Sequence, residues 1–272
     1  MHVVMLDTET TSSKSEEAHI VEVGMVKIDT GLLNGNLEDS IIETFNKRVK
    51  PPVLIPFDAM AVHDITNEDV ADCPTCSEIQ PFVGDFMNGV EVVVCHNAPY
   101  DIPIVSREFP GIFESYRASS GSIICTLRLS KHFDPEQEIT SHSLQALKYR
   151  LGLWGSVKKN VIPLMDTTGA HSALYDSLVD TSLFHYFVMK SLQDADCWIS
   201  RGENDIDEAI HRLAALSHRP ILLKRLTFGK HEGKTYQQVF RYIDPGYLKW
   251  LAKNFDDPDV VHTAKYWLSM GA

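Results

Sequence analysis

Short apolar runs separated by polar stretches predict a chain in which strands and helices alternate. Runs such as Val3–Leu6 and Val92–Val94 end at polar residues, which is typical of buried strands. On this pattern we expect strands near 2–7, 19–28, 43–50, 91–96 and 123–128. Apolar residues at helical spacing predict helices near 58–61, 67–72, 77–88, 102–108, 141–151 and 172–192.

The order of these elements indicates an α/β fold with a mixed sheet flanked by helices. The first three strands follow one another across turns, whereas the last two are separated from their neighbours by helical segments, as in crossover connections. We expect one large domain over residues 1–192 and a small C-terminal α+β domain over 220–272. The acidic stretch 193–219 between them contains part of an amphipathic helix, so it is either a linker or a docking helix.

Two carboxylates lie one residue apart where the first predicted strand ends. Asp7 and Glu9 follow the apolar run in M-L-D-T-E-T-T, and residues two apart on a strand share a face. Two unpaired carboxylates at the edge of a core repel each other and lose hydration, and a divalent cation relieves both costs. The alternative is that D-x-E simply ends a strand at the surface, because so short a pattern is weak evidence alone.

Two later segments place further polar groups beside apolar elements. Asp101 follows the strand at 92–94 in C-H-N-A-P-Y-D, where it is either part of a site or an ordinary helix N-cap. Asp176 lies in the first turns of the predicted helix at 172–192. His171 is five residues before Asp176, so the two share a face only if His171 precedes the helix in a loop, the position that suits a general base. The alternative for His171 is a surface histidine.

Together, D-T-E-T, H-N-A-x-x-D and H-x-A-x-x-D resemble the three motifs of the DEDD-type 3′→5′ exonucleases, and the histidine at 171 places the chain in their histidine branch. The resemblance extends to I-V-E-V-G at 20–24 and to the segments 56–66, 124–130 and 142–152. The segment 226–236 with 244–251 is similar to a small extra domain that one bacterial group of these enzymes carries. Ser12 stands where the family often has glycine, and Tyr100 where phenylalanine is usual.

The resemblance implies a ribonuclease H-like fold and a two-metal hydrolysis of terminal phosphodiesters. Asp7, Glu9, Asp101 and Asp176 would hold two Mg²⁺ ions about 4 Å apart, with Mn²⁺ as a substitute. His171 would take the proton of the attacking water. The resemblance also implies substrate contacts from the backbone of Thr8 and Thr10, the loop histidine His63, and Asn97, which would also shape the loop before Asp101.

Composition sets the remaining expectations. A hydrophobic content of 44% is ordinary for a globular core, and no apolar run approaches the roughly 20 residues of a membrane span. The N-terminus lacks the features of a cleaved signal, so we expect a soluble, cytoplasmic protein. Five cysteines argue against a disulfide framework, and C73-P-T-C76 lacks the second pair that a structural zinc site needs, which favours two ordinary thiols.

The net charge of −12 opposes nucleic-acid binding if it is taken alone, because phosphate contacts favour a basic surface. The four proposed ligands account for part of it, and lysines and arginines gather near the C-terminus beside aromatic residues. We therefore expect a 3′→5′ exodeoxyribonuclease of DNA repair or replication that acts on single-stranded or duplex DNA 3′ ends. The alternatives are an exoribonuclease acting on RNA ends and a non-catalytic adaptor; protein partners stay unknown.

Overall fold

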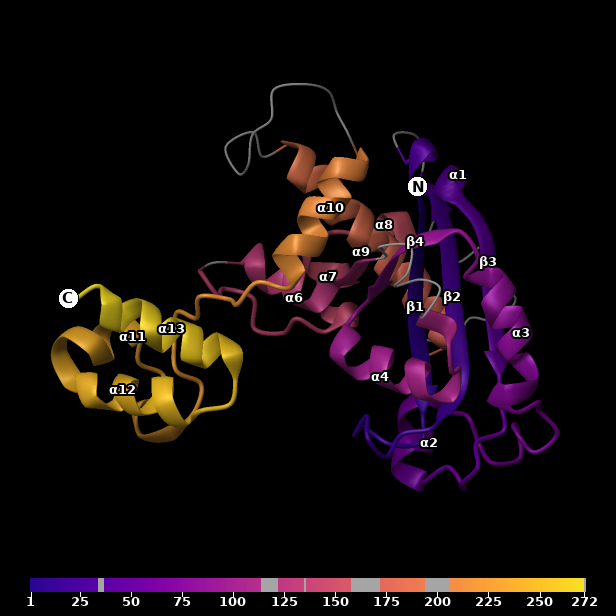
Figure 1. The fold of residues 1–272 in the computed structure, drawn as a ribbon, viewed down its shortest axis with the longest axis horizontal. Coiled ribbons are helices and arrows are strands. Elements are labelled where there is room, and N and C mark those ends of the chain that lie inside the picture. Colours follow the sequence, from indigo (N-terminus) through magenta and orange to yellow (C-terminus); the bar gives the residue numbers. More distant parts are fainter. Residues whose placement is uncertain (34–36, 114–121, 135, 158–171, 194–205, 272) are drawn as a thin grey trace. The chain divides into compact units, whose positions relative to one another are not determined.

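The computed structural model describes residues 1–271 apart from 34–36, 114–121, 135, 158–171 and 194–205. The chain forms two compact units (Figure 1). The first comprises Met1–Leu127 with Ser143–Ser217, and the second comprises Arg128–His142 with His218–Ala272. The short segment 128–142 thus folds with the C-terminal part of the chain. The 75 residues between these two parts, Ser143–Ser217, belong to the first unit.

A five-stranded mixed sheet forms the centre of the first unit, in the order β3-β2-β1-β4-β5. The strands are β1 (His2–Thr10), β2 (Ile20–Asp29), β3 (Ile41–Arg48), β4 (Val90–Cys95) and β5 (Ser122–Cys125). The first three pair antiparallel in a meander, whereas β4 is parallel to both β1 and β5. The predicted mixed sheet flanked by helices is confirmed, with the crossovers where helical segments separate the strands.

The helices of the first unit are α1 (Leu37–Ser40), α2 (Phe57–His63), α3 (Cys76–Phe86), α4 (Ala98–Glu108), α7 (Leu144–Arg150), α8 (Trp154–Ser156), α9 (Ala173–Gln193) and α10 (Ile206–Ser217), with a 3₁₀ turn, η1 (Thr30–Leu32). Helix α6 (Thr126–His132) begins in the first unit and ends in the second. The second unit contains η4 (Gly229–His231), α11 (Tyr236–Gln238), a π-helical turn η5 (Val239–Ile243), α12 (Pro245–Asn254) and α13 (Pro258–Ser269).

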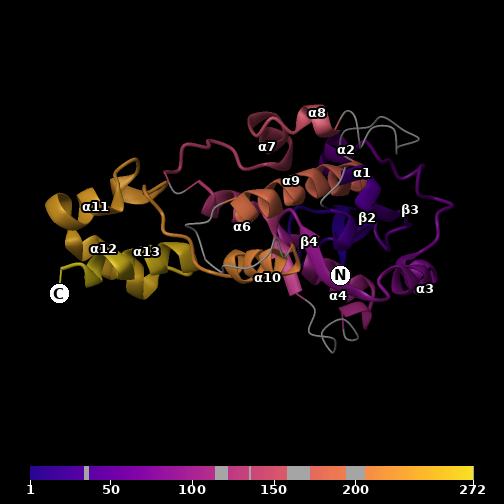
Figure 2. The same ribbon diagram turned by 90° about the horizontal axis from the view of Figure 1, so that it is seen from above.

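Alternation along β1 divides its side chains between two helical layers. Val4 and Leu6 belong to a core cluster with residues of α3 and α4, so these helices cover one face of the sheet. The odd-numbered residues of β1, including Asp7 and Glu9, project to the opposite face. Helix α9 packs against β1 and β2 on that face (Figures 1 and 2). The strand that carries the first motif is therefore buried on both sides.

Three predicted elements differ from those observed. Residues 67–72 form consecutive turns instead of a helix, with Thr66 and Asp69 hydrogen-bonded side chain to backbone in place of a helical ladder. Helix α4 begins at Ala98, four residues before the predicted start, because proline is compatible with a first turn and Pro99 occupies it. The predicted strand at 123–128 ends at Cys125, where α6 begins.

The second unit has its own core of buried side chains, which come from the segment before η4 and from the helices up to α13: Leu226, Tyr236, Val239, Leu248, Leu251, Val260 and Ala264. The expectation of an α+β domain is wrong for the described part of this unit, which has helices and a single antiparallel bridge, Arg225↔Thr235, but no strand. Gly229 and Gly233 lie in the turn between the two bridged residues, and both have a positive φ, which glycine adopts without strain. Across the described helices of the chain, none is long and apolar enough to cross a membrane.

Candidate active site

Asp7, Glu9 and Asp176 converge on the sheet face that α9 covers. One carboxylate oxygen from each lies within 4.8 Å of the other two. Asp7 and Glu9 meet there because they are two apart on β1. Asp176 meets them because α9 crosses the same strand. Residues far apart in the sequence thus form one cluster of oxygen donors.

Close packing of α9 on β2 positions Asp176. Gly24 is the β2 partner of Asp7, and a Cβ added to Gly24 would lie 2.2 Å from the backbone of Ala173. The backbone N–H of Ala173 donates to Glu22 Oε2 at 2.9 Å, and Ser177 Oγ donates to the Gly24 carbonyl at 2.9 Å. The glycine in I-V-E-V-G therefore permits α9 to lie directly on β2, with contacts three residues before Asp176 and one residue after it.

The Asp176 carboxylate is also held from α7. Gln145 Nε2 donates to Asp176 Oδ1 at 2.6 Å. The buried Lys148 Nζ donates in turn to Gln145 Oε1 at 2.5 Å and to the Tyr175 hydroxyl at 2.9 Å. The sequence predicted α7 as a helix but assigned neither Gln145 nor Lys148 to the site. These contacts hold the Asp176 carboxylate in place from α7.

Asp101 is nearly buried, at 3% exposure, in the first turn of α4. It is the fourth residue of that helix, so the alternative of an N-cap aspartate is wrong. Thr8 Oγ1 donates to Asp101 Oδ1 at 2.7 Å, which ties the start of α4 to the end of β1. Asn97 adopts a left-handed conformation (φ 83°) at the helix N-cap, and this turn redirects the chain from β4 into α4.

Burial and mutual repulsion disfavour the charged forms of these groups. The pKa of Asp7 lies well above its ordinary value because it is buried and because Asp101, Asp176, Glu9 and Asp180 repel its charge. Burial, followed by Asp176, Glu22 and Asp101, raises the pKa of Glu9 to about 8. Burial raises the pKa of Asp101 to about 7, although the hydrogen bonds from Thr8 oppose this. Cations placed among these carboxylates would reverse the balance.

The sequence motifs did not assign a fifth acidic residue, Asp180, to the site. It lies one helical turn after Asp176 and is 3% exposed. Thr126 Oγ1 donates to its Oδ1 at 2.6 Å, and His96 Nδ1 lies 3.0 Å from the same threonine hydroxyl. Its Oδ2 makes no hydrogen bond with any residue that the structure describes. Burial raises the pKa of Asp180 to about 7, with repulsion from Asp101 and Asp176. The signal was its i,i+4 spacing from Asp176, which puts both on one helix face.

Two of the predicted substrate contacts, Thr10 and His63, differ in their hydrogen bonds. Thr10 Oγ1 donates to the Ser12 carbonyl at 3.0 Å and also contacts the Tyr100 hydroxyl. His63 is 5% exposed, and its Nδ1 accepts the Ile65 N–H at 3.1 Å. Its Nε2 has no hydrogen-bond partner among the described residues, and burial lowers its pKa. His171, the predicted general base, lies outside the described residues.

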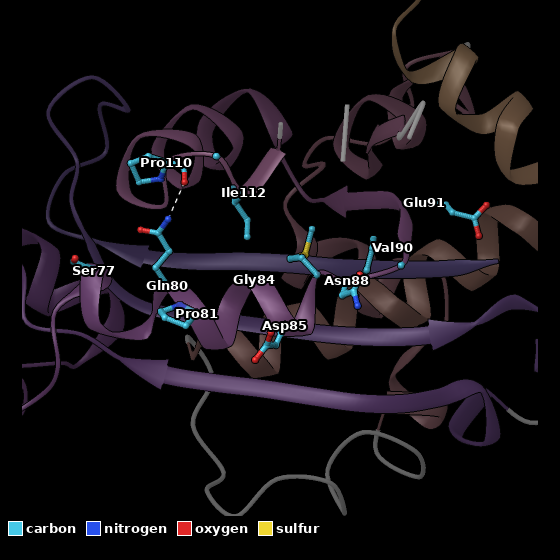
Figure 3. Close-up of a pocket in the computed structure, with 13 residues that line it drawn as sticks. Ser77, Gln80, Pro81, Gly84, Asp85, Asn88, Val90, Glu91, Pro110 and Ile112 are labelled. Atoms are coloured by element: carbon cyan, nitrogen blue, oxygen red, sulfur yellow. Dashed lines mark hydrogen bonds between the residues drawn. The ribbon is translucent and has the colours of Figure 1, made fainter. Parts of the chain in front are cut away.

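An open hollow elsewhere on the first unit does not coincide with the carboxylates. It lies between α3, the start of β4 and the loop at 110–112 (Figure 3). Gln80 Nε2 closes part of it by donating to the Pro110 carbonyl at 2.8 Å. Val90 and Glu91 line it at the amino end of β4, whereas Asp101 follows the carboxyl end of that strand. Ligand sites of α/β sheets lie at carboxyl ends, which favours the carboxylate cluster.

The donor set fits hard divalent cations. All the converging ligands are carboxylate oxygens, which suit Mg²⁺ or Mn²⁺ better than zinc. Cys95, at the end of β4, and Cys125, at the end of β5, are buried free thiols, and burial raises the pKa of Cys95 well above its ordinary value. A thiolate ligand is therefore disfavoured, and the oxygen cluster could hold a divalent metal ion.

Comparisons with known proteins agree with this geometry. Residues 4–184 match the family model described as Exonuclease, and residues 226–256 match the model described as Exodeoxyribonuclease X-like C-terminal. Exodeoxyribonuclease 10 of Escherichia coli K12 is 28% identical over 267 residues, which is 97% of each chain. The DNA polymerase III subunit epsilon of Pasteurella multocida is 30% identical over 189 residues, covering 64% of this chain and 70% of that protein.

Solved structures share the fold. Exonuclease X in complex with 5′ overhanging duplex DNA matches with a TM-score of 0.53 and 24% identity, covering 79% of this chain and 99% of that one. The nuclease domain of 3′hExo, a DEDDh family member bound to rAMP, matches with a TM-score of 0.51 and 17% identity over 74% and 97% of the two chains. The family predicted from three short motifs and the extra C-terminal segment is confirmed: this chain belongs to the exonuclease family.

Proposed function

We propose that this protein is a metal-dependent 3′→5′ exodeoxyribonuclease that releases 5′-mononucleotides from DNA 3′ ends. The observation that carries the proposal is the convergence of Asp7, Glu9 and Asp176, with buried Asp101 repelling Asp7 from the start of α4. A cluster of like charges on a sheet face destabilises a fold unless cations or protons neutralise it. The exonuclease family membership supplies the reaction class for which such a cluster is suited.

In this proposal Asp7, Glu9, Asp101 and Asp176 hold two Mg²⁺ ions, for which Mn²⁺ can substitute. The ions would supply positive charge that activates a water molecule and stabilises the leaving 3′ oxygen. A hydrogen bond from Thr8 orients the Asp101 carboxylate, and one from Gln145 orients the Asp176 carboxylate. His171 accepts the proton of the attacking water, a task that matches the near-neutral pKa of an imidazole.

DNA is the preferred substrate in this proposal. Support comes from the relative named Exodeoxyribonuclease 10, which spans 97% of both chains. The polymerase epsilon subunits among the relatives support a role in DNA repair or replication. We further propose that residues 1–192 form the catalytic domain and residues 220–272 form a second domain. Residues 193–219 are then either a linker between them or a docking helix. The proposed location of the protein is the cytoplasm. An exoribonuclease is the second candidate, because one structure of the same fold holds rAMP.

The test is hydrolysis of matched DNA and RNA oligomers with the same sequence and a 5′ label. With Mg²⁺ we expect a ladder that shortens from the 3′ end of DNA, release of 5′-mononucleotides, and no cleavage in EDTA. Faster shortening of the RNA oligomer would replace the DNA assignment by the ribonuclease. Absence of cleavage of either polymer, with Mg²⁺ or Mn²⁺, would leave only the non-catalytic adaptor.

A further inference from the structure

The C-terminal segment differs in charge from the rest of the chain. Residues 218–272 contain nine lysines and arginines against five aspartates and glutamates, a net charge of +4. The preceding 217 residues contain 16 cationic and 32 acidic side chains, a net charge of −16. The overall charge of −12 therefore conceals a basic region, and a basic surface is the usual electrostatic sign of phosphate binding.

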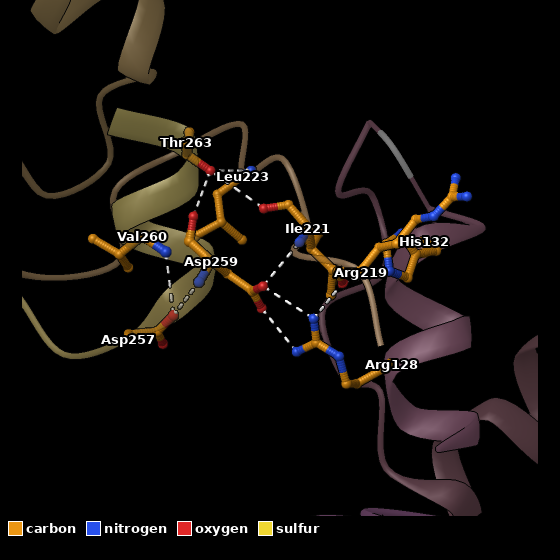
Figure 4. Close-up of polar contacts among 9 residues, drawn as sticks. All are labelled: Arg128, His132, Arg219, Ile221, Leu223, Asp257, Asp259, Val260 and Thr263. Atoms are coloured by element: carbon orange, nitrogen blue, oxygen red, sulfur yellow. Dashed lines mark hydrogen bonds and ion pairs between the residues drawn. The ribbon is translucent and has the colours of Figure 1, made fainter. Parts of the chain in front are cut away.

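An arginine from earlier in the chain pairs with one of the acidic residues of this segment. Arg128 makes a bidentate pair with Asp259, at 3.1 and 3.0 Å, and Asp259 Oδ1 also accepts the Ile221 N–H at 2.8 Å (Figure 4). Thr263 Oγ1 accepts the Leu223 N–H at 2.9 Å beside them. These contacts fasten the entry of the C-terminal segment to α13 and leave α12 outside the network.

Helix α12 buries one side and exposes two lysines and an indole on the other. Leu248 and Leu251 are fully buried in the core of the second unit. Lys249, Trp250 and Lys253 are exposed, at positions that share the opposite face of a helix. Trp250 is 51% exposed, although large aromatic side chains are usually well buried. We call Lys249, Trp250 and Lys253, together with Tyr247, the α12 face.

The two rings of the α12 face form a prearranged pair. Tyr247 and Trp250 are stacked, with ring centroids 6.0 Å apart and planes inclined by 14°. Tyr247 is fixed from the other side by η4: a Cβ on Gly229 would lie 2.4 Å from its hydroxyl oxygen, and the His231 ring meets it edge-on at 4.9 Å. Lys230 Nζ lies 5.2 Å from its centroid. Because the tyrosine is held, the exposed indole is oriented at little entropic cost.

The lysines of the α12 face are available for an anion. Lys230 is paired with Asp244 at 2.6 Å, whereas neither Lys249 nor Lys253 has a carboxylate within ion-pair distance in the part of the chain that the structure describes. The combination is a flat aromatic surface flanked by two ammonium groups four residues apart. Such a combination stacks a base on the ring and neutralises the phosphates on either side of it.

We propose that the α12 face binds single-stranded nucleic acid, with Trp250 stacking one base and Lys249 and Lys253 contacting adjacent phosphates. This inference rests on the proposed function for the identity of the strand, which is the DNA whose 3′ end is degraded. An acidic peptide would satisfy the lysines but would leave the stacked rings without a planar partner. Single-stranded nucleic acid satisfies both features, and it does so without sequence preference because every base has a flat face.

The test measures binding by the full-length protein without hydrolysis. Anisotropy of fluorescent dT and rU oligomers is followed in EDTA for wild type and Trp250→Ala. We expect Trp250→Ala to weaken binding by about five- to a hundredfold, the usual share of one stacked base. Trp250→Phe should recover most of the loss, because it keeps a ring. Circular dichroism checks the fold of each variant, which the exposure of Trp250 should leave intact.

The lysines are tested by salt dependence. We expect Lys249→Gln with Lys253→Gln to lower the slope of log K against log[salt] by about 1.4, or about 0.7 for each lost phosphate contact. Lys265→Gln is the matched control, since Lys265 is an exposed lysine of α13 outside the α12 face. Equal slopes for the double variant and wild type, or unchanged affinity in Trp250→Ala, would overturn the proposal. A larger effect on rU than on dT would assign the face to RNA.

A small substrate separates this proposal from the proposed function. The p-nitrophenyl ester of thymidine 5′-phosphate offers a scissile phosphate but no second nucleotide for the α12 face. We expect Trp250→Ala to hydrolyse this ester at the wild-type rate while its KM for a DNA oligomer rises. Failure of wild type to hydrolyse either compound would refute the nuclease assignment. Normal oligomer KM in Trp250→Ala would refute only the role of the α12 face.

Discussion

The carboxylate cluster beside β1 and the α12 face differ in three respects: the sign of their charge, the exposure of their side chains, and the presence of aromatic rings. The cluster of Asp7, Glu9 and Asp176 is half-buried and is repelled by Asp101 and Asp180, which are each 3% exposed, whereas Trp250 is 51% exposed between two lysines. Like charges make the first region costly to fold unless cations or protons neutralise it, whereas the second region exposes two lysines that would attract an anion. A net charge of −12 describes neither region, because it sums a net charge of −16 over residues 1–217 and +4 over residues 218–272.

Asp7→Ala would separate the two regions most clearly. We expect hydrolysis of a 3′-labelled DNA oligomer with Mg²⁺ to be abolished, because Asp7 is the carboxylate that all the others repel. Binding of the oligomer in EDTA should persist, since the α12 face is intact and one negative charge is gone. The control is Asp85→Ala, an exposed acid of α3. Unchanged hydrolysis in Asp7→Ala would remove this residue from the site.

His171→Ala comes next in expected effect. Loss of the proposed general base should lower kcat by about 10²- to 10⁴-fold, the usual contribution of positioned acid–base catalysis. Metal-induced thermal stabilisation should be retained, because the carboxylates remain. The readouts are kcat over a series of pH values and melting curves with Mn²⁺. A variant that kept the wild-type kcat and its pH profile would show His171 to be a surface histidine.

A pair of glycine substitutions tests how closely α9 must pack on the sheet. Gly24→Ala places a Cβ 2.2 Å from the Ala173 backbone, so α9 and Asp176 must shift. We expect a loss of about 1–3 kcal/mol in the free energy of unfolding, as for overpacked cores, and a marked fall in kcat. A Cβ added at Gly84 has no atom within 4 Å, so Gly84→Ala should raise the free energy of unfolding by up to about 1 kcal/mol. Urea unfolding of both variants measures the contrast.

The smallest expected effect is on the pH dependence of the metal-free fold. Folded Glu9 holds a proton up to about pH 8, and folded Asp101 and Asp180 up to about pH 7. Unfolded carboxyls release theirs near pH 4. Between these limits the folded state binds more protons, so stability in EDTA should fall as pH rises from about 4 to about 8.

Divalent cations should cancel this trend. A cation binds the ionised carboxylates, so stabilisation by Mn²⁺ should grow with pH across the same range. Melting temperatures in EDTA and in Mn²⁺ at pH 5.5, 7 and 8.5 measure the effect. Glu9→Gln, which removes a group whose pKa burial raises to about 8, is the matched variant and should flatten the EDTA curve. A melting temperature that rose with pH in EDTA would contradict the proposed protonation states.

Much of this protein was predictable from local patterns. Apolar runs predicted all five strands to within a few residues, and the spacing of Asp7 and Glu9 predicted two carboxylates on one face. Three motifs sufficed for the family. The errors fell where a single side chain outweighs periodicity: Pro99 allowed α4 to begin early, and Thr66 with Asp69 made turns where a helix was expected.

Tertiary structure alone decided which side chains support the site. The packing of α7 and α9 brings three further side chains to the site: Asp180, Gln145 and Lys148. The sequence of a helix determines which residues share a face, but it does not determine which surface that face will contact. The exposure of Trp250 was equally undetermined, since Leu248 and Leu251 compete for the same core. Local sequence sets backbone conformation through short-range sterics and hydrogen bonds. Burial and repulsion among distant carboxylates depend on contacts that exist only after the chain has folded.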